Sequence, residues 1–202
     1  MKKAGILAGF VPLIVYGLLA GGFPGNVVIA PGAALIATVI TGFSDLRKGM
    51  ILSWATLVLF GSLLIAVGVL GMTGIIPVTG ILIYAALAAV TFGSILAGIP
   101  FTLQYARGMV DRALWENPVF IRVNVLMTGA WGGIFLANLV LSCSALMDPD
   151  FSRIASPLTY IFLVAGIVFT MWYPGHVRKK YSSPPDTEGH HGKAPPRSPP
   201  PS

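Results

Sequence analysis

Three long tracts of this chain contain no Asp, Glu, Lys or Arg, and they limit the fold more than any other feature. They cover residues 4–44, 49–106 and 123–147. A run of about 20 apolar residues is long enough to cross the hydrocarbon core of a bilayer as a helix, so the first two tracts can each hold two crossings. The charged share of the whole chain, 10%, is less than half of the roughly 25% that is usual in soluble domains. This composition argues against a soluble fold.

We predict an all-α, polytopic transmembrane helix bundle, with one domain over residues 1–180. The start Met1-Lys2-Lys3, followed by an apolar run, also fits a signal peptide. A retained first span is favoured, because the run is long and lacks a clean cleavage site. From Tyr181 onward, the proline, serine and glycine content predicts a disordered cytoplasmic tail over 181–202. The six predicted spans are 4–22, 27–43, 51–71, 81–103, 123–146 and 154–173.

Lysine and arginine fall almost entirely on one side of this six-span topology. Only Arg153 lies in a loop on the opposite side. Because basic residues in short loops stay in the cytoplasm, both termini are predicted to be cytoplasmic, and anionic lipid headgroups are the expected partners of the basic residues. The residues on the basic side are Lys2, Lys3, Arg47, Lys48, Arg107, Arg112, Arg122, Arg178, Lys179, Lys180, Lys193 and Arg197.

The stretch between the fourth and fifth spans collects charged, aromatic and amide side chains. Its apolar residues recur every three or four positions from Leu103 to Leu114, which predicts a cytoplasmic amphipathic connector helix of about three turns. Asn117-Pro118 ends it, because proline disfavours helical geometry in the residue before it. Two interpretations stay open: an interfacial connector, or the lining of a polar vestibule or lipid-headgroup site. The polar and aromatic residues concerned are Gln104, Arg107, Asp111, Arg112, Trp115, Glu116 and Asn124, with possible ion pairs between Arg107 and Asp111 and between Arg112 and Glu116.

The same region carries a resemblance to known proteins. The segment PFTLQYAR, from Pro100 to Arg107, is followed by Trp115, Pro118, Phe120, Asn124, Thr128, Trp131-Gly132, Phe135 and Asn138. This order resembles a family of uncharacterised bacterial multi-pass membrane proteins over about residues 95–140. It is more distantly similar to the intracellular septation protein A family of inner-membrane proteins. The resemblance implies a cell-envelope protein in the bacterial cytoplasmic membrane. At Gly108 this chain departs from the acidic residue expected there.

Two helix faces are candidates for contacts. Small residues at four-residue spacing in the fourth span, namely Ala85, Ala89, Gly93 and Ala97, predict a ridge for close helix packing. The ridge serves either inside the monomer or in a homodimer. In the fifth span, a stripe of Asn124, Thr128, Trp131, Phe135 and Asn138 advances by three or four residues along one face. It acts either as interhelical hydrogen-bond glue or as the lining of a solute path.

No catalytic arrangement can be assembled from the spans, because none contains His, Asp or Glu. The lone Cys143 and the adjacent His190-His191 offer no disulfide framework or metal site. We therefore expect no cofactor and no enzymatic activity. We also expect no nucleic-acid partner, because the basic residues fall in short pieces between the spans and not on one accessible face. The leading hypothesis is a non-enzymatic scaffold or partner-binding subunit that acts through the fifth span and the connector. The alternative is a channel or transporter for a small solute or lipid, with Asn124, Thr128 and Asn138 along the path.

Overall fold

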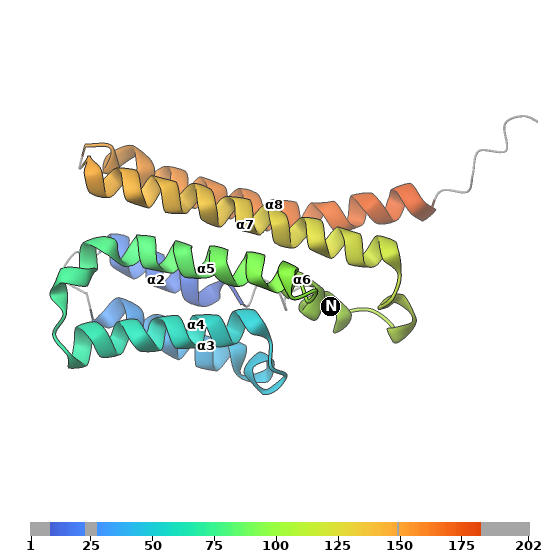
Figure 1. The fold of residues 1–202 in the computed structure, drawn as a ribbon, viewed down its shortest axis with the longest axis horizontal. Coiled ribbons are helices and arrows are strands. Elements are labelled where there is room, and N and C mark those ends of the chain that lie inside the picture. The colour runs from blue at the N-terminus through green and yellow to red at the C-terminus, as the bar shows by residue number, and fades with distance from the viewer. Residues whose placement is uncertain (1–8, 23–27, 149, 183–202) are drawn as a thin grey trace, which may run out of the picture.

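The computed structural model describes residues 9–22, 28–148 and 150–182; these form helices joined by short turns, and no strand occurs among them (Figure 1). The predicted all-α class is confirmed. Within the described ranges, the seven α-helices are α2 Val11–Gly22, α3 Ile29–Arg47, α4 Ile51–Leu64, α5 Thr79–Leu96, α6 Phe101–Arg107, α7 Pro118–Met147 and α8 Ser152–Ser182. Three short segments join them: a π-helix at Ile65–Val69 and 3-10 helices at Thr73–Val78 and Arg112–Leu114.

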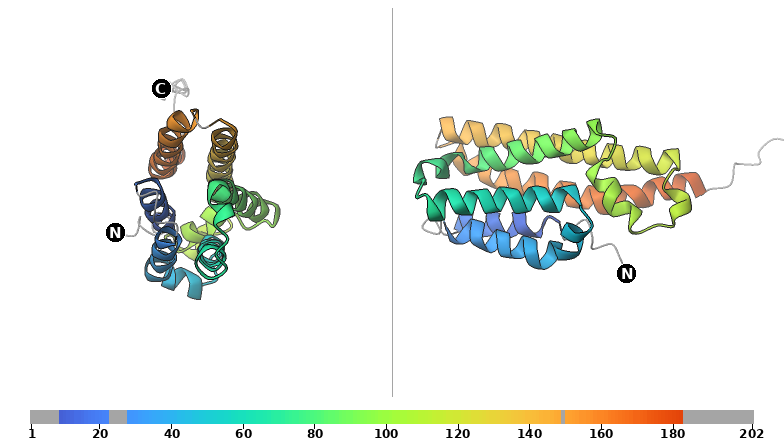
Figure 2. Two further views of the ribbon diagram at one scale, coloured as in Figure 1. Left: turned by 90° about the vertical axis from the view of Figure 1, so that its left-hand side faces the viewer. Right: turned by 60° about the horizontal axis from the view of Figure 1, so that its bottom comes forward.

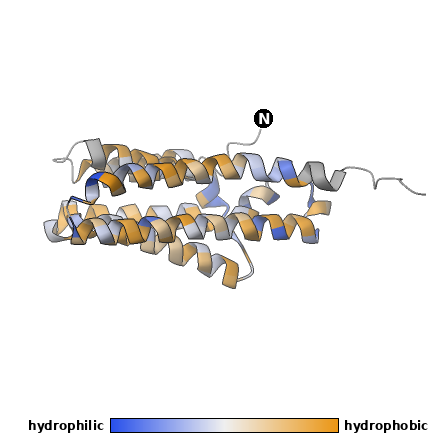
Figure 3. Ribbon diagram, turned by 90° about the horizontal axis from the view of Figure 1, so that it is seen from above, coloured by the Kyte–Doolittle hydropathy of each residue, from blue (hydrophilic) through white to orange (hydrophobic). Residues whose placement is uncertain are grey.

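Within the described residues, five helical segments are long and apolar enough to cross a membrane, and they overlap the predicted second to sixth spans. The segments are Ile29–Arg47, Ile51–Val69, Thr73–Leu96, Pro118–Met147 and Ser152–Val177. The first predicted span is represented by the shorter apolar helix Val11–Ala20, and its beginning lies outside the described residues, as does the predicted tail after residue 182. Figure 3 shows apolar residues along the helices and hydrophilic ones gathered mainly near the ends.

Consecutive long helices pack side by side in alternating directions. On α5 and α7, Gly80 lies against Ser142 and Phe92 lies against Gly132, so the two helices are antiparallel. The end view in Figure 2 shows the helices arranged around a common centre. α8 also contacts α2, because the Tyr160 hydroxyl donates a hydrogen bond to the Gly17 carbonyl at 2.9 Å.

Aromatic side chains fill the centre of the bundle. The rings of Phe10 and Trp131 stack with 4.1 Å between their centroids, and Phe135 lies 5.6 Å from Trp131. On the other side of the core, the rings of Tyr16 and Phe60 are 5.5 Å apart. Phe10, Phe60, Trp131 and Phe135 are all at most 2% exposed. Close packing of this kind holds membrane helices together, since lipid supplies little hydrophobic drive for helix association.

The connector differs from the predicted amphipathic helix of three turns. α5 ends at Leu96, and Gly98 has a φ of 73°, a left-handed conformation that favours glycine. The amide of Ile99 bonds back to the Ser94 carbonyl and that of Gly98 to Ile95, which is the usual glycine-terminated helix end. α6 then runs for seven residues and stops at Arg107. Between α6 and α7 the chain forms turns and the short 3-10 helix Arg112–Leu114.

Two further predicted boundaries were wrong. Asn117 begins α7 as its N-cap, because its side-chain oxygen accepts the amides of Val119 and Phe120 at 2.9 and 3.3 Å; Pro118 occupies the first helical position, where proline is favoured. At the other end of the chain, α8 continues through Pro174 to Ser182. Figure 1 shows α8 bending along its C-terminal half, as expected where a proline lacks its backbone donor.

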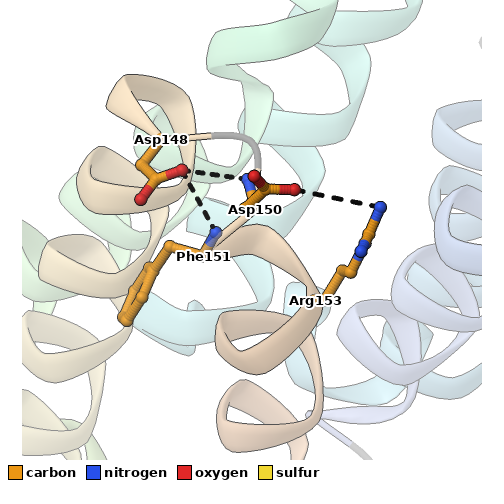
Figure 4. Close-up of polar contacts among 4 residues, drawn as sticks. All are labelled: Asp148, Asp150, Phe151 and Arg153. Atoms are coloured by element: carbon orange, nitrogen blue, oxygen red, sulfur yellow. Dashed lines mark hydrogen bonds and ion pairs between the residues drawn. The ribbon is translucent and has the colours of Figure 1, made fainter.

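The short turn between α7 and α8 lies at the end of the bundle opposite the connector. The Asp148 carboxylate accepts the backbone amides of Asp150 at 3.0 Å and Phe151 at 3.4 Å (Figure 4). Arg153 pairs with Asp150 at 3.8 Å, and both side chains are more than four-fifths exposed. An exposed pair of this kind contributes at most about 1 kcal/mol. The turn is therefore held mainly by the Asp148 hydrogen bonds.

Candidate functional site

The polar residues of the predicted stripe all face the interior of the bundle. Asn124, Thr128, Trp131 and Asn138 are between 0 and 3% exposed. They lie on one face of α7, together with the fully buried Phe135. The structure thus places these side chains against other helices and away from the lipid-facing surface.

Near the connector, the stripe fastens α6 to α7. The Thr102 hydroxyl donates to the Asn124 carbonyl at 2.8 Å, and the hydroxyl oxygens of Thr102 and Thr128 are also 2.8 Å apart. The Asn124 side-chain amide donates to the Phe120 carbonyl, one turn earlier on the same helix. These groups are buried and bonded to protein atoms. This part of the stripe has the geometry expected of interhelical glue.

In the middle of the stripe, Trp131 joins α7 to α8. Its indole N–H donates to the Thr170 hydroxyl at 3.0 Å, and that hydroxyl donates to the Gly166 carbonyl at 2.8 Å. A Cβ atom built on Gly166 would lie 2.9 Å from the Trp131 ring, so α8 can approach this closely only with glycine there. Trp131 and Phe135 separate Asn138 from the polar cluster around Thr128. The buried polar groups therefore form no continuous line along α7.

Asn138 is the exception among the stripe residues. It is 0% exposed, and neither Nδ2 nor Oδ1 has a hydrogen-bond partner. Buried polar atoms are nearly always satisfied, and leaving an amide unpaired in an apolar setting costs several kcal/mol. Asn138 is thus the one stripe residue whose polar atoms are not accounted for by contacts within the described chain.

Gln104 and Tyr105 bind α6 to the start of α4. The Ile51 amide, one of the unpaired donors at that helix start, donates to Oε1 of Gln104 at 2.9 Å. The Tyr105 and Ser53 hydroxyl oxygens are 3.2 Å apart. Burial raises the pKa of Tyr105 to about 12, although the hydrogen bond with Ser53 opposes the shift. Gln104 therefore has a structural role in the fold and does not line a vestibule.

Beyond α6, two arginines lie against one tryptophan. The guanidinium carbons of Arg107 and Arg112 are each 5.5 Å from the Trp115 ring centroid, a distance at which cations are attracted to an indole face. The indole N–H donates to the Arg107 carbonyl at 3.2 Å. We call Arg107, Arg112 and Trp115 the arginine–tryptophan cluster. Arg112 is exposed, Arg107 and Trp115 are partly buried, and Nε of Arg107 is buried without a partner.

The predicted ion pairs of the connector do not form. Asp111 and Glu116 are both exposed, and within the described ranges the ion pair found is that of Arg153 with Asp150. The physical reason is the end of α6 at Arg107: residues four apart face one another only on a continuous helix. The two arginines are consequently free of carboxylate partners.

The predicted small-residue ridge does not pack inside the monomer. Ala85 is partly buried, while Ala89, Gly93 and Ala97 are exposed. A Cβ atom built on Gly93 would meet nothing within 4 Å. The interior face of α5 is formed by larger side chains and hydroxyls instead: Ile83, Leu87, Thr91 and Ser94. The interpretation of the ridge as intramolecular packing was wrong for these three residues.

Several residues that build this region could not be recognised from the sequence as structurally important. Thr102, Tyr105 and Thr170 become important only through partners far along the chain. Among the residues described, no group of three or more His, Cys, Asp or Glu side chains is placed to hold a metal ion. The side chains of this region can form hydrogen bonds. The tryptophan can bind a cation, and the arginines can bind an anion.

Comparison of the chain with family models, with curated proteins and with solved structures gives no match. The resemblance to bacterial multi-pass membrane proteins, and to the septation protein family, therefore stays a prediction. The class that the fold supports is an α-helical protein with five helices suited to crossing a membrane.

Proposed function

We propose that this protein is a non-enzymatic integral protein of the bacterial cytoplasmic membrane that binds a second membrane protein through its connector. The observation that carries the proposal is the arginine–tryptophan cluster: two guanidinium groups lie against one indole, and neither has a carboxylate partner. Arg112 and the neighbouring Leu114 are exposed. Aromatic residues and arginines are the side chains most enriched at binding hot spots. An acidic or aromatic segment of the partner fits this surface.

The connector is well suited to this role because it is held in place. α6 is bonded to α7 through Thr102 and to α4 through Gln104. Trp115 is then tied to the end of α6 by its own hydrogen bond. A surface already ordered in the free protein loses little conformational entropy on binding.

The interior supports a scaffold better than a channel. The aromatic core at Trp131 and Phe135 interrupts the stripe, and Asn124 and Thr128 are engaged with protein groups. A conducting path needs polar groups or a water-filled passage along the span. The stripe therefore serves as glue near the connector, in keeping with the scaffold interpretation.

The proposed orientation places the connector in the cytoplasm. Arg47 and Lys48 lie at the α3–α4 turn, which meets α6 through the Ile51–Gln104 hydrogen bond, and Arg107 and Arg112 follow in the connector. Arg153 follows the α7–α8 turn, at the opposite end of the bundle (Figure 1). The positive-inside rule supports a cytoplasmic connector and cytoplasmic termini. Anionic headgroups on that face would accompany the basic residues.

Site-specific photo-crosslinking tests the proposal. A photoreactive amino acid replaces Leu114, which is 45% exposed, in the native membrane of the source cell. The expected result is one discrete adduct, which Trp115→Ala or Arg112→Glu reduces at least tenfold.

A matched control places the same probe at Phe151 and uses Arg153→Glu as the variant, because Arg153 is an exposed arginine at the other end. This variant should leave the Leu114 adduct unchanged. A smear of lipid adducts at position 114, insensitive to Trp115→Ala, would contradict a protein partner.

A further inference from the structure

We propose that Asn138 belongs to a closed polar site inside the bundle that binds one small, neutral, hydroxyl-bearing guest: a water molecule or a small alcohol-like solute. The inference is independent of the partner-binding proposal. It starts from the two unpaired polar atoms of a side chain that is 0% exposed.

The site lies at a defined level of the bundle. Asn138 is seven residues beyond Trp131 on α7, a rise of about 10 Å along the helix. α2 runs in the same direction from Phe10, which stacks on Trp131, so Gly17 reaches the same level. α8 runs the opposite way from Thr170, whose hydroxyl accepts the Trp131 hydrogen bond. Tyr160 therefore lies within about one helical turn of the level of Asn138.

The packing of α5 against α7 places Tyr84 at the level of Asn138. Gly80 touches Ser142 on α7, and both Tyr84 and Asn138 lie four residues from that contact, on antiparallel helices. Tyr160 reaches α2 at Gly17, the residue next to Tyr16. By helix register, Tyr16, Tyr84 and Tyr160 therefore lie near the level of the unpaired amide, one on each of α2, α5 and α8.

The chemistry of the surroundings selects the guest. Residues 49–106 and 123–147 contain no charged side chain, so α5 and this part of α7 offer no counter-charge. An ion would be unpaired there and strongly disfavoured. The side-chain amide has an NH₂ group that donates and an oxygen that accepts. A hydroxyl group can accept a hydrogen bond from the first and donate one to the second. A neutral guest with an O–H group meets these requirements.

The Asn138 side chain is closed off from the surface at 0% exposure, and Tyr160 lies at about its level on the neighbouring helix α8. Tyr160 is 41% exposed and forms one end of an apolar groove that runs along α8 to Trp172. Its hydroxyl is fastened to α2 by the bond to the Gly17 carbonyl. A movement of this ring would admit a guest, and its return would enclose it.

Selective ¹⁵N labelling of asparagine tests the site directly, since the chain contains four asparagines, Asn26, Asn117, Asn124 and Asn138. In lipid nanodiscs, the side-chain amide of Asn138 should show a nuclear Overhauser effect to a hydroxyl or water proton. The matched control is Asn124, which is also buried but already bonded to the Phe120 carbonyl, and should show none. Substitution of the other three asparagines assigns the signal even if Asn138→Leu does not fold.

Added glycerol distinguishes the two candidate guests, because glycerol carries C–H protons and water does not. A contact from the Asn138 amide to water protons that glycerol leaves unchanged identifies an enclosed water. A contact to the C–H protons of glycerol at Asn138, absent at Asn124, identifies a solute. No contact to water, hydroxyl or glycerol protons at Asn138 would overturn the proposal.

Discussion

The indole N–H of Trp131 donates a hydrogen bond to the Thr170 hydroxyl across the α7–α8 interface, with 3.0 Å between the two atoms. The same indole stacks on Phe10 at 4.1 Å. One side chain thereby connects the beginning of the chain with its last two long helices. Its polar atom is satisfied by protein, as hydrocarbon surroundings require.

Removing this hydrogen bond should loosen the α7–α8 pair modestly. Trp131→Phe keeps an aromatic ring against Phe10 but lacks the donor, and Thr170→Val removes the acceptor. Each should lower the free energy of unfolding by about 1 kcal/mol, measured by denaturation with sodium dodecyl sulfate. The double variant should cost less than the sum by about 0.6 kcal/mol. Strict additivity would mean that the bond does not contribute.

Three glycines should respond differently to the same substitution. At Gly166 a new Cβ would lie 2.9 Å from the Trp131 ring, which is locked in the core. At Gly132 it would meet Phe92, which is 37% exposed and can turn toward lipid. Gly166→Ala should therefore lower the melting temperature more than Gly132→Ala.

Gly93→Ala provides the reference, because nothing lies within 4 Å of the added atom. Helix propensity alone should then stabilise this variant by up to about 1 kcal/mol. A strong loss of stability at Gly93 would indicate that the exposed face of α5 packs against another molecule. Equal losses at Gly166 and Gly132 would contradict the locked position of Trp131.

The positions of the long apolar helices could be predicted from the sequence because charge-free tracts of that length have few alternatives. The face of the stripe followed from helical periodicity, and Asn124 and Asn138 are indeed buried. The connector was harder: its apolar spacing suits a helix, but glycine at 108 ends α6, and Asn117 acts as an N-cap. Local periodicity does not reveal which end of a helix a capping residue belongs to.

The predictions for the small-residue ridge on α5 and for the end of α8 were wrong for a different reason. Small residues on α5 fit a close contact equally well inside or outside the monomer, and only the packing of Ile83 and Leu87 decides which face turns inward. Pro174 marks a boundary in soluble proteins, but membrane helices tolerate proline, since neighbouring groups can satisfy the freed carbonyl. The partners Thr102 and Thr170 depended on tertiary contacts that periodicity cannot supply.

The hydroxyl of Thr102 should govern how firmly α6 is held. Thr102→Val keeps the shape but removes the bonds to the Asn124 carbonyl and the Thr128 hydroxyl. Backbone amides of α6 should then exchange with deuterium about fivefold faster, for a loss of about 1 kcal/mol. Ser156→Ala, at an exposed position on α8, is the control and should leave that exchange unchanged. An unchanged rate in Thr102→Val would contradict the role of this bond.

Tyr105 should make stability fall at high pH. Its pKa is about 12 in the fold, against about 10 in an unfolded chain. Between these values the unfolded phenol has lost its proton while the folded one keeps it, so raising the pH favours unfolding. The stabilisation is complete below about pH 10 and is lost on approach to pH 12.

Difference absorbance of phenolate between the wild type and Tyr105→Phe isolates this group from the other tyrosines. The expected titration has its midpoint near pH 12. A midpoint near 10 would show that the Tyr105 hydroxyl is open to water and not held beside Ser53.

Cysteine accessibility in intact cells tests the central claim, that the uncharged tracts cross the bilayer with the connector on the cytoplasmic side. The sole native thiol is first removed by Cys143→Ser, and Arg112→Cys and Asp150→Cys are then introduced separately at exposed positions. A membrane-impermeant maleimide should label position 150 in intact cells and position 112 only after permeabilisation. Labelling of position 112 from outside intact cells would contradict the account.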